Sequence, residues 1–227
     1  MYIVRLLSDS NPQNLTFTDL FQNQQKGYLV LTHSMPSAAG IEKINAHILE
    51  RVIQLNIPEM QEDEIKEVLK EFFVELNWQI YSKFRMSIID EHGISFLMFI
   101  LYYDKVFVVQ FGRLVAGMIQ NNKFKEIGKS WDNFPIKTKE DLFLLGGLDR
   151  DIFVKIHTLD LHSDTVLFAL PAAEAKILQS EFTVDLNCLE NYLTSKKKEG
   201  SSPFFLVQYK HSSTKKGSFF RRLWGRK

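Results

Sequence analysis

Two stretches in the N-terminal half of the chain carry apolar residues three or four positions apart, which is the spacing of one helical face. The first stretch ends before Pro58, which is a helix stop signal. The second opens with acids at residues 62–64, where a helix dipole favours negative charge. The pattern therefore predicts two consecutive amphipathic helices. Their apolar positions are Ile41, Ile44, Ile48, Val52 and Leu55, then Ile65, Val68, Leu69, Phe72, Phe73, Leu76 and Ile80.

Runs of β-branched and aromatic residues flank this helix pair on both sides. Ile94–Tyr103 and Val106–Phe111 are joined by Asp104-Lys105, so we expect a hairpin. Strand blocks around a helix pair indicate an α+β fold with helices packed on sheets. The other predicted strands are Tyr2–Leu7, Tyr28–Leu31, Leu114–Ile119, Ile152–Leu161, Thr165–Leu170 and Phe204–Tyr209; Pro171–Gln179 and Val184–Leu193 are predicted helices, and Lys196–Gly200 a polar loop.

The composition is that of an ordinary folded domain, with 227 residues, of which 45% are apolar and 24% charged. Cys188 is the only cysteine, which excludes an internal disulfide and fits a reducing compartment. We see no signal peptide at the start. The longest apolar stretch, Phe96–Tyr103, is far shorter than the roughly 20 residues that span a bilayer. We therefore expect a cytoplasmic protein.

Charge divides the chain into a body of residues 1–210 and a tail of residues 211–227. The body holds 22 Lys and Arg against 27 Asp and Glu, a net charge of −5. The tail holds six basic residues and no acid, so the total of +1 conceals two opposite charges. Because the body lacks a basic excess, we do not expect it to bind nucleic acid.

Four stretches of the body follow one another in an order similar to that of a known family. Leu29–Gly40 keeps a Met, an Ala-Ala-Gly and a helix start after a buried strand, and Gly93–Gly112 is a strand, a short turn and a second strand. Val166–Ala173 and Ser201–Val207 occupy the places of two later strand motifs. The body resembles the metal-dependent PPM-type (type 2C) serine/threonine protein phosphatases, and the bacterial and sporulation stage II E-like members most. The resemblance implies a four-layer αββα sandwich, in which helix pairs flank two antiparallel sheets.

In that family, aspartates at the strand ends hold two Mg²⁺ or Mn²⁺ ions, and a bridging water attacks the phosphate. Hard divalent cations need such oxygen ligands, whose negative charge also reduces the repulsion between the two metals. Every metal carboxylate that the resemblance places is absent from this sequence. The matching positions are His33 with its neighbour Ser34, Arg113, Pro171, and one of Gly200, Ser201 and Ser202. The family's phosphate-binding arginine has only Arg5 as a weak match.

Two acids could rebuild a metal site. Glu42 and Glu174 each lie in the first turn of a predicted helix, and His33 precedes the first of them. They would then serve as relocated ligands. The alternative is that the two glutamates are first-turn acids favoured by the helix dipole and that His33 is a neutral loop histidine. The histidines show no paired metal-binding spacing.

The tail mixes aromatic and basic residues, a composition that suits an anionic membrane surface or an acidic partner. The other interpretation is a disordered, solubilising end. Gly217 and Gly225 limit any helix there. The residues that would make such a contact are Lys215, Lys216, Phe219, Phe220, Arg221, Arg222, Leu223, Trp224 and Arg226.

The sequence thus favours a pseudophosphatase: a PPM-type domain without its metal centre or any other cofactor, which binds a protein partner or regulates one. A divergent, active metal-dependent phosphatase with relocated ligands is the first alternative. The second is an adaptor that docks on a membrane surface through its basic tail, which would place a cytoplasmic protein peripherally at the membrane.

Overall fold

Two five-stranded antiparallel sheets form the centre of the computed structural model, which describes residues 1–11, 14–33, 41–84, 94–121, 123–127, 144–146, 152, 154–181, 185–200 and 202–211. The β9 sheet has the order β1-β10-β9-β6-β7, and the β4 sheet has the order β2-β3-β4-β5-β8. In the β9 sheet the strands are β1 (Tyr2–Leu7), β6 (Leu114–Gln120), β7 (Lys123–Ile127), β9 (Val166–Pro171) and β10 (Phe205–Tyr209). In the β4 sheet they are β2 (Thr16–Phe21), β3 (Lys26–His33), β4 (Ser95–Tyr102), β5 (Lys105–Phe111) and β8 (Ile156–Asp160).

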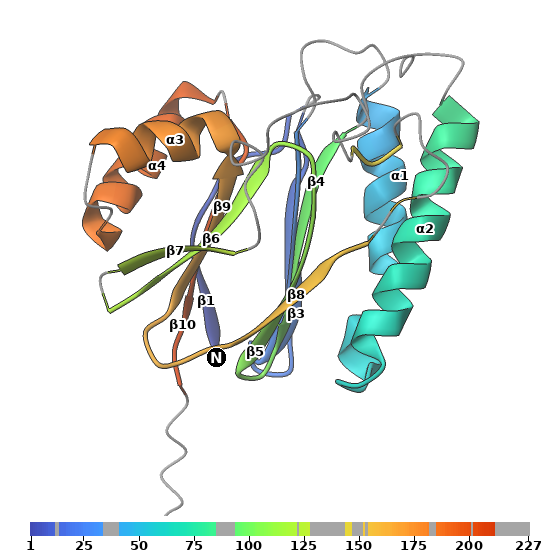
Figure 1. Ribbon diagram of the computed structural model, residues 1–227, viewed down its shortest axis with the longest axis horizontal. Coiled ribbons are helices and arrows are strands. Elements are labelled where there is room, and N and C mark those ends of the chain that lie inside the picture. Colours follow the sequence, from blue (N-terminus) through green and yellow to red (C-terminus); the bar gives the residue numbers. More distant parts are fainter. Residues whose placement is uncertain are drawn as a thin grey trace, which may run out of the picture.

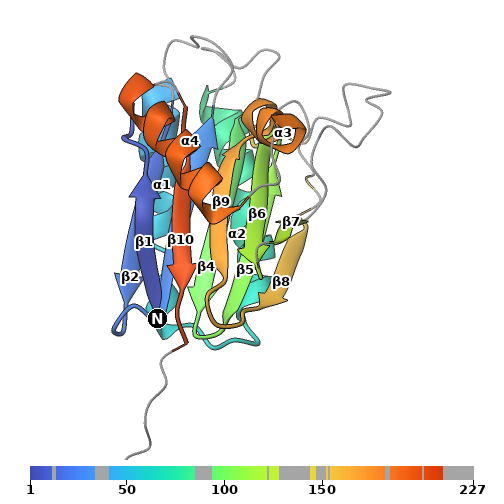
Figure 2. The ribbon, with the colours of Figure 1, turned by 90° about the vertical axis from the view of Figure 1, so that its left-hand side faces the viewer.

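Helices cover the outer faces of both sheets (Figures 1 and 2). Helices α1 (Ile41–Ile53) and α2 (Ile65–Phe84) lie on the β4 sheet, with the short 3-10 helix η1 (Ile57–Glu59) between them. Helices α3 (Ala172–Glu181) and α4 (Leu186–Glu199) lie on the β9 sheet. The predicted four-layer αββα sandwich is confirmed.

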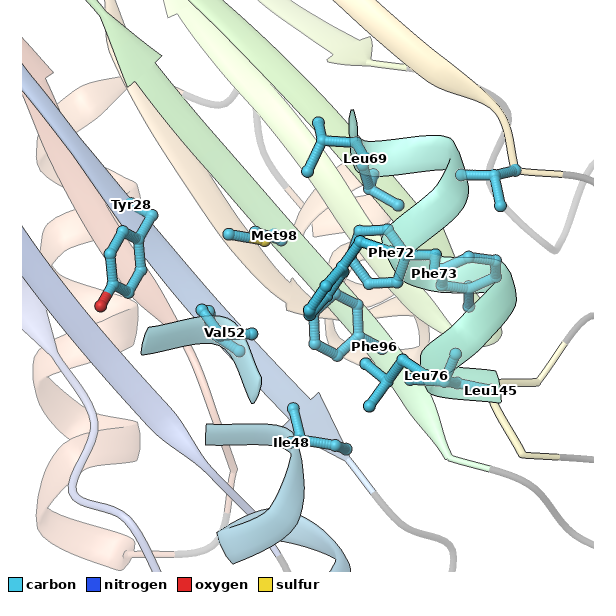
Figure 3. Packing of buried hydrophobic residues seen from close by; sticks show 14 of the residues in the cluster. Tyr28, Ile48, Val52, Leu69, Phe72, Phe73, Leu76, Phe96, Met98 and Leu145 are labelled. Carbon is cyan, nitrogen blue, oxygen red and sulfur yellow. The ribbon is translucent and has the colours of Figure 1, made fainter. Parts of the chain in front are cut away.

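The apolar stripe of α2 packs on the β4 sheet, as its periodicity predicts (Figure 3). Phe73 is fully buried, and its ring centroid lies 5.1 Å from that of Phe96 and 5.4 Å from that of Phe111. Ile48 and Val52 of α1 belong to the same buried cluster. Burying a Phe side chain stabilises a fold by about 1.5–3 kcal/mol, so this stripe fixes α2 on the sheet.

A second apolar layer fills the space between the two sheets. Phe99 of β4 meets Phe205 of β10 edge to face, with ring centroids 4.9 Å apart. All eight residues of β4 are buried, because one face of the strand contacts the helix layer and the other contacts the β9 sheet. Burial on both faces explains why the strand is a continuous apolar run rather than an alternating one.

The secondary structure differs from the prediction at five points. Strands β2 and β7 were not predicted at all, and β8 covers only Ile156–Asp160 of the expected Ile152–Leu161. Helix α4 continues through the lysines of the predicted polar loop and ends at Gly200, whose φ of 65° is left-handed. Pro171 is the last residue of β9 rather than the first of a helix.

Several predicted site residues lie outside the described residues, namely Ser34, Ser201 and the tail residues Lys215, Lys216, Phe219, Phe220, Arg221, Arg222, Leu223, Trp224 and Arg226. Within the described ranges, no helix is both long enough and apolar enough to cross a bilayer.

Candidate functional site

Three of the predicted site residues lie at one end of the sandwich. His33 ends β3 and pairs with Ser95 at the start of β4. Arg113 joins β5 to β6, and its backbone N–H donates to Ser95 Oγ at 2.9 Å. Pro171 ends β9 opposite Leu114 of β6, and the N–H of the next residue donates to the Arg113 carbonyl at 3.0 Å. The strand ends that the resemblance matched to metal ligands therefore lie close together.

The corner between β5 and β6 requires a glycine. Gly112 has a φ of +72°, and a Cβ on it would lie 2.6 Å from Ser95 Oγ and 3.0 Å from Ser95 Cα. Both the left-handed backbone and the close approach exclude a side chain here. This corner holds Arg113 beside β4, where the backbone of Arg113 satisfies the Ser95 hydroxyl.

His33 is held by a polar network that connects β3, the segment before β2 and α1. Its Nδ1 lies 2.9 Å from the side-chain oxygen of Asn14, which accepts the ring N–H. Burial lowers the pKa of His33 from its ordinary value of 6.5, so the imidazole is neutral at pH 7. His33 therefore donates a hydrogen bond from Nδ1 to Asn14 and remains uncharged.

The residue before His33 extends this network into α1. Thr32 is fully buried, and its hydroxyl accepts from the Leu15 N–H at 2.9 Å and donates to Asn45 Oδ1 at 2.7 Å. Asn45 Nδ2 is buried and has no hydrogen-bond partner among the described residues. Among the described residues, the network therefore contains one buried donor, Asn45 Nδ2, that has no acceptor.

A buried carboxylate, that of Glu174, lies near the end of β9. It lies in the first turn of α3, is only 9% exposed, and accepts a hydrogen bond from Ser202 Oγ. Its Oε2 is buried without a partner in the described part of the chain. Burial raises the pKa of Glu174, against the opposing effects of the Ser202 hydroxyl and of Lys196. Such a site disfavours the charged form of the carboxyl group.

The relocated ligands do not form one site in the described residues. Glu42 is exposed on α1, on the helix layer over the β4 sheet, whereas Glu174 lies on α3 over the β9 sheet. No group of three or more His, Cys, Asp and Glu residues in the described ranges could hold a metal ion. Glu42, Glu174 and His33 are therefore not brought together.

The strand-end residues do not fit a pair of divalent cations. Pro171 has no side-chain ligand atom, Arg113 is a cation, and the Nδ1 of His33 is engaged with Asn14. Mg²⁺ and Mn²⁺ bind oxygen ligands with negative charge, which none of these three side chains supplies. No catalytic step through metals follows from this set.

Arg5, the weak match for a phosphate-binding arginine, is engaged elsewhere. Its guanidinium donates to Gln208 Oε1 at 2.8 Å and forms an ion pair with Glu190 of α4. Glu190 connects β1 to α4, and Gln208 connects β1 to the neighbouring strand β10. Arg5 therefore ties α4 to the β9 sheet.

Sequence reasoning did not identify Asn14, Asn45, Ser95 or Ser202 as neighbours of these residues. Asn45 carried a usable signal, since it is a polar residue beside Ile44 and Ile48 on the apolar face of the first predicted helix. A buried amide group needs a hydrogen-bond partner, so the sequence could have been searched for a polar residue that pairs with Asn45. The other three contacts depend on strand pairings that no local pattern contains.

The fold is that of serine/threonine phosphatases. No protein-family model matches the sequence, and no curated protein matches it. Among solved structures, the serine/threonine phosphatase Stp1 from Staphylococcus aureus superposes with a TM-score of 0.63 at 11% identity, over 92% of this chain and 94% of that one. The Mycobacterium tuberculosis phosphatase PstP/Ppp gives a TM-score of 0.64 at 12% identity, over 93% and 99%.

A third solved structure shows what the same architecture holds elsewhere. The catalytic domain of the phosphatase PstP in complex with two manganese ions matches with a TM-score of 0.63 at 11% identity, over 92% of this chain and 97% of that one. Likeness at this level of identity establishes the shared fold. Activity must be argued from the side chains of this chain.

Proposed function

We propose that this chain is a pseudophosphatase: a PPM-type phosphatase fold that has lost the two-metal centre and acts as a protein-binding or regulatory module in the cytoplasm. One observation carries the proposal. The strand ends that meet at one end of the sandwich present His33, Arg113 and Pro171, which together carry a positive charge and no carboxylate. Such a set opposes the binding of paired divalent cations.

The buried polar network supports the same conclusion. The amide oxygens of this network accept hydrogen bonds from the protein, and neither carries the negative charge of a carboxylate. Asn14 Oδ1 lies 2.9 Å from the His33 ring nitrogen, and Asn45 Oδ1 accepts from Thr32. These uncharged oxygens therefore do not replace the missing carboxylates.

The test is metal-dependent phosphatase activity of the purified full chain. We expect no Mn²⁺- or Mg²⁺-dependent hydrolysis of an aryl phosphate or a phosphopeptide above the buffer rate, and no heat of Mn²⁺ binding by calorimetry. The manganese-binding PstP domain is the positive control in both assays. Mn²⁺-dependent turnover that the His33→Ala variant abolishes would show an active metalloenzyme and end the proposal.

A matched pair of variants separates the remaining alternative. If Glu42 and Glu174 were relocated ligands, Glu42→Gln and Glu174→Gln would each weaken Mn²⁺ binding. Under the pseudophosphatase proposal both variants give the same flat calorimetric trace as the unmodified chain.

A further inference from the structure

The outer face of α2 exposes large apolar side chains. Val74 and Trp78 are 44% and 46% exposed, and they lie four residues apart, so they share one side of the helix. Glu67 and Glu71 are exposed on the same side, one and two turns closer to the start of α2. An aromatic and an aliphatic side chain bordered by acids form a surface that suits a segment both apolar and basic.

The helix pair also carries most of the negative charge of the body. Residues 41–84 hold nine acids and five bases, a net charge of −4, within a body whose net charge is −5. The acids are densest at the start of α2, where Glu62, Asp63 and Glu64 are all exposed. The opposite charge of this protein lies in the tail, which has six basic residues and no acid.

The tail follows strand β10 of the β9 sheet, whereas α2 lies on the β4 sheet. Strand β10 ends and α2 begins at the same end of the sandwich (Figure 1). The ring of Tyr209 lies 5.1 Å from that of Tyr2, whose hydroxyl donates to the Lys105 carbonyl at 2.9 Å. The Lys105 ammonium group in turn forms an ion pair with Glu62. A short series of contacts thus leads from the last described strand to the acids that precede α2.

The spacing of residues in the tail matches the spacing on α2. The four residues from His211 to Lys215 reach up to about 13 Å beyond the last described residue. The nine residues from Lys215 to Trp224 reach up to about 30 Å, and the helix rises about 20 Å between Ile65 and Trp78. The stretch from Lys215 to Trp224 is therefore long enough to follow α2 from its start to Trp78.

We propose that residues 212–227 dock in cis on the outer face of α2. Lys215 and Lys216 lie against the acidic start of the helix, and the apolar residues of the tail cover Val74 and Trp78. The apolar residues are Phe219, Phe220, Leu223 and Trp224. This contact is independent of whether the chain has phosphatase activity.

The experiment places one nitroxide label in the tail of the full chain. Cys188→Ser removes the only native thiol, and Ser218→Cys provides a single labelling position beside the aromatic residues. We expect the label to broaden the amide NMR signals of Glu71, Val74 and Trp78, and to spare those of α4. At 1 M salt, where the Debye length is about 3 Å instead of about 10 Å at 0.1 M, we expect the broadening to weaken.

Charge reversal tests the specificity of the contact. Asp63→Lys with Glu71→Lys should remove the broadening, as should Arg221→Glu with Arg222→Glu. Combining both pairs should restore it. The control is Glu42→Lys with Glu50→Lys, which makes the same change in net charge at two exposed positions of α1 and should leave the broadening intact.

Three outcomes would overturn the proposal. Broadening that is absent from α2 would exclude the docking surface. Broadening that disappears on dilution of the labelled chain with an excess of unlabelled chain would show a contact between molecules instead of within one. The third outcome combines two results: the α2 signals are not broadened in solution, and the full chain sediments with phosphatidylserine vesicles. If Arg221→Glu with Arg222→Glu abolishes that sedimentation, the tail binds a membrane surface instead of α2.

Discussion

Replacing Thr32 by Val tests the network that holds His33. Valine has nearly the shape of threonine, so the substitution opens no cavity and removes only the hydroxyl group. Two buried groups then lose their partner, the Leu15 N–H and Asn45 Oδ1. Each unsatisfied buried group costs about 1–3 kcal/mol, so we expect about 2–6 kcal/mol of lost stability for the two groups. In a domain of this size that corresponds to a fall in Tm of roughly 4–24 °C.

The matched control is Thr32→Ser, which keeps the hydroxyl and deletes a methyl group. It should lose only about 1 kcal/mol, because both hydrogen bonds survive. The measurement is urea unfolding of both variants followed by circular dichroism, with thermal unfolding as a check. If Thr32→Val is as stable as the unmodified chain, or if Thr32→Ser costs as much, then the hydroxyl is not what connects β3 to α1.

Three further substitutions test other parts of the molecule. Burial raises the pKa of Glu174 above 4.5, so its stabilising contribution is present below pH 4.5 and is lost as the pH rises through the raised value. Glu174→Gln should not show this loss when unfolding is measured over a series of pH values. If stability changes with pH in the same way in the variant and in the unmodified chain, the expectation is wrong. Gly117→Ala should destabilise by about 1–3 kcal/mol, because its Cβ would lie 2.3 Å from Phe168 Cζ; an unchanged urea midpoint counts against this packing. Asp185→Ala removes the side chain that accepts the hydrogen bond of the Cys188 N–H at the start of α4, and it should cost about 1 kcal/mol in the same assay. An unchanged urea midpoint would show that α4 does not depend on this cap.

The long helices and strands on the side of the β4 sheet were predictable because their apolar residues follow clear patterns along the chain. Helices α1 and α2 and the β4–β5 hairpin bury wide apolar faces, so their residue patterns alone identify them. Strands β2 and β7 were not predicted because they lack such a pattern. Both are edge strands with mostly half-exposed or exposed residues, so neither has a continuous apolar run.

The end of α4 shows how a polar run can continue a helix. Lys196, Lys197 and Lys198 looked like a loop because they are charged and follow the last apolar position. In the structure they occupy the last turn, where the helix dipole favours cations, and Lys196 pairs with Glu199 at 2.8 Å. Gly200 supplies the left-handed residue that ends the helix. The glycine was the better stop signal.

The predicted site depends on which hydrogen-bonding atoms remain available, and the sequence does not contain that information. Residue types alone left His33 open as a ligand, since a histidine offers a lone pair to a metal or a proton to an acceptor. The contact with Asn14 Oδ1 places the ring proton on Nδ1, and burial keeps the ring neutral, so Nε2 retains its lone pair. Among the described residues, Asn45 Nδ2 adds a buried donor without an acceptor, and none of His33, Arg113 and Pro171 adds a carboxylate. A pair of divalent cations requires anionic oxygen ligands, which these side chains do not supply, so the argument against metals depends on missing carboxylates.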